Sequence, residues 1–268
     1  MRSGGVEVLV SESLRLKRID LFGMRVHAVR SEEALEVIHD WVERADGITR
    51  YVVTPNVQHA VMNQGHSDFR AAYDAASLVL VDGAPLVWAS RLLGPGLPER
   101  IAGSDFFPLL LASARPERPL PVYLLGAAPG IGERAARMMT EQFPNVRVLG
   151  TYSPPLGFEN DEAENERIFE LVNRAAPGVL VLGLGTPKQE LWIHRYADRL
   201  RVPVVLCLGA TIDFMAGIKV RAPVWMRRVG LEWIHRVARE PRRLAPRYAS
   251  DAVHFPSLLW RELRGRQR

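Results

Sequence analysis

Residues 122–132 read VYLLGAAPGIG, four mostly apolar residues followed at once by a turn that holds three glycines. The next residues, 133–143, fit a helix, so this stretch encodes a strand, a tight turn and a helix. The unit recurs, with strands expected at 146–149, 179–182 and 204–208 and helices at 161–175 and 189–200. Strands that alternate with helices at this spacing predict an α/β, Rossmann-like parallel sheet with helices on both faces.

The N-terminal half has shorter elements. Residues 1–17 are polar and lack periodicity, which predicts a loose N-terminus. We expect a strand over 19–29 and a helix from Ser31 to about Arg44, with Ser31 as its N-cap. Further strands are expected at 51–54 and 77–81, and further helices up to about Asn63, over 69–76 and over 85–93. We therefore divide the chain into the loose N-terminus, an α/β core (residues 18–217) and a helical C-terminal appendage (residues 218–268).

Composition narrows the function classes. The 268 residues are 47% hydrophobic and 24% charged, which is typical of a globular protein and excludes disordered and fibrous classes. The single cysteine, Cys207, lies in an apolar run and is expected to be a small core residue. Apolar runs are too short to span a membrane, and the first twenty residues are too charged for a signal peptide. We expect a soluble, cytoplasmic protein.

Charge is concentrated in the appendage. Residues 219–268 hold thirteen Lys and Arg residues against four acidic residues, whereas the rest of the chain has a net charge of −4. Tryptophans at 225, 233 and 260 lie among these basic residues, a pattern that suits an anionic membrane surface. A solvated basic face is the alternative. Nucleic acid is disfavoured, because the sequence has no recognisable nucleic-acid-binding motif.

Two glycine-rich turns follow expected strands, at the sheet edge where ligands bind. Gly126–Gly132 resembles the cofactor loop of short-chain dehydrogenases and would hold a phosphate or nucleotide. However, none of the six tyrosines has a lysine four residues later, and no acid follows the next strand to bind a ribose. In Gly183–Glu190, the amide of Gln189 suits a uracil or a sugar hydroxyl, and Lys188 suits a phosphate. Either turn could instead only start a helix.

Polar residues also follow the two short strands. Asp82 comes directly after four apolar residues, so partial burial would give it the raised pKa of a general base, although Asp-Gly is equally a common turn pair. Thr54 and Asn56 end the neighbouring segment. Arg100 suits a diphosphate but is equally well a surface residue. The seven histidines are scattered without ligand spacing, so we expect no metal site and no cofactor.

Six segments occur in a specific order: 54–56, 80–83, 99–105, 183–190, 209–217 and 221–233. Together they closely resemble the WecG/TagA/CpsF glycosyltransferases, from about Ile19 to Tyr248. The resemblance implies an inverting, metal-independent transferase that moves an N-acetylmannosamine-type sugar from a UDP donor to a polyprenyl-diphosphate-linked sugar at the inner membrane face. Two features depart from the pattern: His235 stands where an aromatic residue is usual, and the residues after Tyr248 are unmatched.

By motif position, Asp82 is implied to be the catalytic base, with Thr54 beside it. The appendage is implied to dock on the membrane and to supply arginines for diphosphates. The predicted binding residues are Asn56, Arg100, Gly126, Gly185, Lys188, Gln189, Glu190, Asp213, Arg221, Arg228 and Arg236. The partners are then the UDP-sugar, the lipid-linked acceptor and an anionic membrane, with a homo-oligomer possible. The alternatives are an NAD(P)-dependent oxidoreductase that uses Gly126–Gly132 and a non-enzymatic module that binds anionic membranes.

Overall fold

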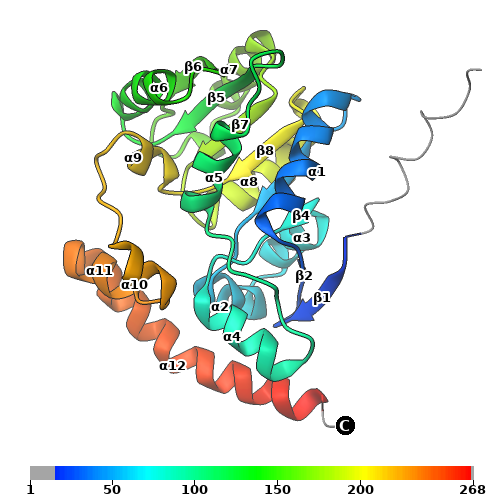
Figure 1. The fold of residues 1–268 in the computed structure, drawn as a ribbon, viewed down its shortest axis with the longest axis vertical. Coiled ribbons are helices and arrows are strands. Elements are labelled where there is room, and N and C mark those ends of the chain that lie inside the picture. Colours follow the sequence, from blue (N-terminus) through cyan, green and yellow to red (C-terminus); the bar gives the residue numbers. More distant parts are fainter. Residues whose placement is uncertain (1–15, 267–268) are drawn as a thin grey trace, which may run out of the picture.

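A six-stranded, all-parallel sheet forms the centre of the molecule (Figure 1). The computed structural model describes residues 16–266, apart from the side chains of Arg228 and Arg266. In spatial order the strands are β4 (Leu78–Val79), β3 (Arg50–Val53), β8 (Val204–Cys207), β7 (Val179–Gly183), β5 (Leu120–Gly126) and β6 (Val146–Tyr152). This arrangement confirms the α/β fold expected from the alternation of strands and helices.

Helices cover both faces of the sheet, because its strands are apolar on both sides. Tyr51 and Val53 of β3 pack into one apolar layer and Val52 into the other. One layer contains α2 (Val57–Gly65), α3 (Ser67–Ala75), α4 (Ala84–Leu93), α7 (Glu162–Ala175) and α8 (Lys188–Tyr196). The opposite layer contains α1 (Ser31–Arg44), α5 (Gly103–Ala112), α6 (Ile131–Gln142) and α9 (Thr211–Met215). Single 3-10 turns, η1 (Phe158–Asn160) and η2 (Ala197–Arg199), follow β6 and α8.

The N-terminal strand differs from the expectation. Instead of one strand over 19–29, the chain forms an antiparallel hairpin of β1 (Arg18–Leu21) and β2 (Met24–His27). Its two-residue turn, Phe22-Gly23, has φ angles of 54° and 72°. Both values are positive, as a type I′ hairpin turn requires. A phenylalanine rarely adopts positive φ, which is why the pattern alone did not indicate a turn.

The appendage is helical, as predicted, and lies against the core. It contains α10 (Val224–Arg228), α11 (Glu232–Arg239) and the long α12 (Pro241–Arg266). In Figure 1, α12 runs along α2 and α4, with α10 and α11 near its first turns. Leu244 and Leu258 of α12 are buried, and the ring of Phe255 meets Phe22 edge-on at 5.4 Å. The appendage therefore packs on the same layer that contains α2 and α4.

Candidate active site

A cleft of about 330 Å³ lies between the core and the appendage. The core contributes two strand-to-helix loops and the residues Arg100 and Ser104 around the start of α5, and the appendage contributes side chains of α11 and α12. The polar and aromatic side chains that line it are Asn56, Asp82, Arg100, Ser104, Glu232, Trp233, Arg236, Arg247, Tyr248, Asp251 and Phe255. Four of the predicted site residues, Asn56, Asp82, Arg100 and Arg236, are thus gathered in one cleft.

Backbone contacts hold Asp82 beside Asn56. The backbone N–H groups of Asp82 and Gly83 donate to the carbonyl of Pro55, at 2.9 and 3.3 Å. A Cβ atom on Gly83 would lie 3.1 Å from the Cα of Asn56, so this close approach favours glycine. Asn56 caps α2 by accepting a hydrogen bond from Gln58 N–H at 3.0 Å. The two loops therefore form one rigid edge of the cleft.

The carboxyl group of Asp82 is largely removed from water, with 30% of its side chain exposed. Burial raises its pKa above the usual range, and the negative charge of Glu232 adds to this effect. The positive charges of Arg100, Arg236 and Arg221 oppose the shift. A carboxylate with a raised pKa and positive charges nearby suits a general base that works close to an anionic substrate.

Arg100 lies among three carboxylates. Its Nη1 atom is 3.7 Å from Asp82 Oδ1 and 3.5 Å from Glu232 Oε2, and its Nη2 atom is 3.3 Å from Asp105 Oδ2. Asp105 in turn accepts hydrogen bonds from two appendage arginines, Arg221 at 2.9 Å and Arg227 at 2.5 Å. The predicted ligand Arg221 is therefore engaged by a core carboxylate at the edge of the cleft.

Arg236 and Arg247 are the cleft cations on α11 and α12. Arg236 forms no ion pair with any residue in the described part of the chain. Arg247, which the sequence analysis did not single out, donates to Asn56 Oδ1 at 3.4 Å and lies 4.0 Å from Asp251. Burial lowers the pKa of Arg247. Its only sequence signal was its place in the basic appendage, which it shares with twelve other cations.

Gln189 and Glu190 belong to a buried hydrogen-bond network rather than to the cleft wall. The Gln189 side chain accepts from Gly209 N–H at 3.1 Å and donates to Glu190 Oε1 at 2.9 Å. The Thr186 hydroxyl also donates to Glu190 Oε1, at 3.0 Å. Glu190 is only 1% exposed, yet the nearby His59 and Gln189 side chains hold its pKa below the usual range in spite of burial.

His59, another residue that sequence reasoning missed, connects this network to the cleft. Its Nδ1 atom accepts from Asn56 N–H at 3.1 Å, which places the proton of the neutral ring on Nε2. That Nε2 atom lies 2.8 Å from Thr186 Oγ1 and 3.6 Å from Glu190. A histidine three positions after an asparagine gives no sequence signal for this role, because its partners lie about 130 residues away.

The remaining predicted residues make other contacts. Thr54 donates to the carbonyl of Cys207 at 3.3 Å, joining the ends of β3 and β8. Lys188 pairs with Glu159 at 2.8 Å, and Asp213 pairs with Lys219 at 3.4 Å. Further predicted residues are two glycines with positive φ, Gly126 and Gly185, and Arg228, whose side chain lies outside the described part of the structure.

Gly126 is required by packing. A Cβ atom there would lie 2.6 Å from the backbone carbon of Gly183, at the ends of β5 and β7. Around Gly185, in contrast, nothing lies within 4 Å of such a Cβ atom. The turn that contains Gly126 therefore has a structural reason for its glycine that is independent of any phosphate.

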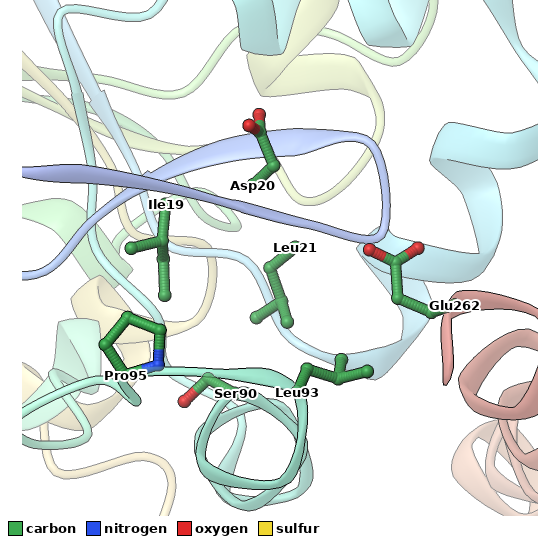
Figure 2. A pocket seen from close by; sticks show the side chains of 7 residues that line it. All are labelled: Ile19, Asp20, Leu21, Ser90, Leu93, Pro95 and Glu262. Atoms are coloured by element: carbon green, nitrogen blue, oxygen red, sulfur yellow. The ribbon is translucent and has the colours of Figure 1, made fainter. Parts of the chain in front are cut away.

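A second cavity, of about 460 Å³, lies between β1, α4 and the end of α12 (Figure 2). Figure 2 shows Ile19 and Leu21 pointing from β1 towards α4, with Asp20 on the opposite side of the strand. Glu262 approaches from α12. None of the predicted site residues lines this cavity, so we place the candidate site in the cleft around Asp82.

Two features are absent from the described residues, 16–266. No group of three or more His, Cys, Asp and Glu residues there is arranged to hold a metal ion. Within the same residues, no helix has the length and apolar character needed to cross a bilayer.

Comparison with known proteins gives the same family that the sequence motifs resemble. A model of the glycosyl transferase WecG/TagA/CpsF family matches residues 19–268. An N-acetylglucosaminyldiphosphoundecaprenol N-acetyl-beta-D-mannosaminyltransferase of Bacillus subtilis (strain 168) is 30% identical over 203 residues, 76% of each chain. A protein of the same name from Staphylococcus aureus (strain MRSA252) is 26% identical over 235 residues, 88% of this chain and 90% of that protein.

Proposed function

The chain belongs to the WecG/TagA/CpsF family of glycosyltransferases, and we propose that it transfers an N-acetylmannosamine-type sugar from a UDP donor to a polyprenyl-diphosphate-linked N-acetylglucosamine. The names of the relatives from Bacillus subtilis and Staphylococcus aureus support this choice of sugar and acceptor. Membership of the family also removes the oxidoreductase and the non-enzymatic module as alternatives. The observation that carries the proposal is the cleft in which the Asp82 carboxylate faces arginines of both core and appendage.

In the proposed reaction Asp82 is the general base. One of its carboxylate oxygens takes the proton of the acceptor hydroxyl while that oxygen attacks the anomeric carbon of the donor sugar. The bond between this carbon and the UDP oxygen breaks on the opposite side, so the configuration inverts. Asn56, beside Asp82, offers an amide to a sugar hydroxyl or to the acceptor. The raised pKa of Asp82 supports this role, because a stronger base takes a proton more readily.

The departing diphosphate gains negative charge and needs positive groups near it. Arg236 lines the cleft and forms no ion pair among the described residues, so it is the cation best placed for this role. Arg100 is shared among three carboxylates and can redirect its guanidinium when an anion enters. We therefore propose neutralisation by arginine, without a metal ion.

A lipid-linked acceptor requires the cleft to approach a membrane. The appendage forms one wall of the cleft and is strongly basic, whereas the rest of the chain has a net negative charge. Trp225 and Val229 of α10 and its following turn are exposed, and Trp88 of α4 is exposed beside Gly230. Basic and aromatic side chains of this kind suit the interface of an anionic bilayer. We propose that the enzyme binds the inner face of the cell membrane peripherally.

The proposed function is tested by measuring sugar transfer directly. Full-length protein is incubated with UDP-N-acetylmannosamine and polyprenyl-diphosphate-linked N-acetylglucosamine in detergent, with and without a chelator, and the disaccharide product is analysed. We expect product of inverted anomeric configuration at an unchanged rate in chelator. UDP-N-acetylglucosamine and UDP-glucose serve as donor controls. Efficient transfer from either control donor, with none from UDP-N-acetylmannosamine, contradicts the proposed sugar, and loss of activity in chelator contradicts the metal-independent mechanism.

A further inference from the structure

Glu232 brings a second carboxylate to the cleft, and it comes from the appendage. It lies in the first turn of α11, where a negative charge is favoured by the helix dipole. Its side chain is 13% exposed and lines the same cleft as Asp82. Its partners are arginines on both sides of the interface, Arg100 of the core at 3.5 Å and Arg221 at 3.7 Å.

Asp82 and Glu232 share one nitrogen atom. Both carboxylates lie nearest to Nη1 of Arg100, at 3.7 and 3.5 Å. Their two oxygens are therefore no more than about 7 Å apart, close enough for the charges to interact strongly in a partly buried site. Arg100 Nη1 therefore has two carboxylate acceptors within reach, and a closer approach to one of them competes with a closer approach to the other.

We infer that Glu232 is a positioning residue of the active site, which competes with Asp82 for the Nη1 nitrogen of Arg100 and so keeps the base from being locked in an ion pair. This inference rests on the proposed role of Asp82 as the base. It assigns to the appendage a function besides supplying cations, because α11 places a negative side chain as well as a positive one in the cleft of the base.

Each of the other charged groups around Asp82 shifts its pKa in the direction set by its charge. Arg100 on the core, Arg236 on α11 and Arg221 before α10 lower its pKa, whereas burial and Glu232 raise it. Tyr248 of α12 also faces it. Removal of the negative charge of Glu232 would therefore lower the pKa of Asp82 and leave it a weaker base. The expected change is about one pH unit, as for a unit charge at this distance in a medium of intermediate dielectric.

Two measurements on full-length protein test the inference. The first is a carbon NMR titration of the Asp82 carboxyl, assigned with Asp82→Asn, in wild type and Glu232→Gln. This readout does not depend on turnover, so it remains decisive even if the wild type transfers no sugar, a result that would contradict the proposed function instead. The second is the pH dependence of kcat/KM for the UDP-sugar.

Glu240→Gln is the matched control. It makes the same chemical change at the end of the same helix, where Glu240 pairs with Lys219 and Arg243 outside the cleft. We expect Glu232→Gln to lower the pKa of Asp82 by about one unit, to move the acidic limb of kcat/KM to lower pH and to reduce the maximal rate. Glu240→Gln should leave the Asp82 titration at its wild-type position.

Three outcomes would overturn the inference. One is an Asp82 titration in Glu232→Gln that coincides with that of the wild type. Another is an equal shift in Glu240→Gln, which would mean that loosening of the appendage is the cause. The third is loss of turnover in Glu232→Gln as complete as in Asp82→Asn without any change in the Asp82 titration, because Glu232 would then take part in the reaction directly. A melting temperature within the range of the control shows that Glu232→Gln is folded.

Discussion

Arg227 of α10 donates a hydrogen bond to Asp105 of α5 at 2.5 Å, across 122 residues of sequence. Arg221 reaches the same carboxylate oxygen at 2.9 Å and also donates to the carbonyl of Ser104 at 2.6 Å. With Arg100 on its other oxygen, Asp105 contacts three guanidinium groups at once. One core carboxylate therefore fixes the start of the appendage against the wall of the cleft.

Replacement of Asp105 should release this contact. We expect Asp105→Ala to lower the free energy of unfolding by about 1–2 kcal/mol, because charged hydrogen bonds are lost at a site that is only partly exposed. The appendage should also become more sensitive to trypsin, measured as the rate of first cleavage within residues 219–268. Glu166→Ala, which removes an exposed ion pair with Arg199, is the control. Equal cleavage rates in the two variants would contradict the proposal that Asp105 holds the appendage against the core.

Asp82→Asn should abolish the proposed base while keeping the shape of the site. We expect kcat to fall about 10²–10⁴-fold, with UDP binding retained in calorimetry. In the wild type, burial raises the pKa of Asp82, and only the carboxylate accepts a proton. Activity should therefore be lost as the pH falls through this raised pKa, and the acidic limb of kcat/KM should lie above the usual range of an exposed aspartate, near 4. A full rate in Asp82→Asn would exclude Asp82 as the base.

The sequence predicted the parts of the site that depend on local pattern. Asp82 and Asn56 each follow an apolar strand, and parallel strands bring such positions to one edge of the sheet. In the structure both residues line the same cleft. That reasoning could not show that Gly126 is needed for contact with Gly183, because a glycine turn that packs and one that binds phosphate have the same pattern.

Other features depend on tertiary contacts that no local pattern encodes. Glu232 and Arg247 reach the cleft only because α12 packs against α2 and α4, and α11 packs against α12. Arg221 was expected at a diphosphate, but a carboxylate more than 100 residues earlier already engages it. Helix α5 was not anticipated, since Pro108 inside it and the Gly/Pro loop before it are typical helix breakers. The charge pairs join residues that lie far apart in the sequence, and the appendage folds back onto the core; local sequence patterns indicate neither.

His59 should prove important for stability because it satisfies groups on two loops. His59→Phe leaves Asn56 N–H and the Thr186 hydroxyl without their partner and removes the histidine beside the buried Glu190. We expect a loss of about 2–4 kcal/mol in urea unfolding at neutral pH. His66→Phe, at an exposed position next to α3, is the control and should change stability by less than about 0.5 kcal/mol. Similar losses in both variants would contradict the role of the network.

We expect membrane association to depend separately on the charge of the appendage and on its apolar contacts. The appendage carries thirteen basic residues against four acids in 219–268, and each basic residue near an anionic surface contributes about 1 kcal/mol at low salt. Full-length protein should therefore float with vesicles that contain phosphatidylglycerol, and much less with pure phosphatidylcholine. Salt should weaken the binding, because it screens the charges.

The apolar contribution should survive salt and depend on α10. Trp225 is 62% exposed, and a tryptophan at that position can enter the headgroup region while the arginines remain at the phosphates. Trp225→Ser should therefore reduce the vesicle-bound fraction at every salt concentration. Leu156→Ser removes an even more exposed apolar side chain, 99% accessible, from the loop before η1, and should leave flotation unchanged. If Leu156→Ser reduces flotation as much as Trp225→Ser, or if neither vesicle type binds the protein, the appendage is not the membrane-contacting surface.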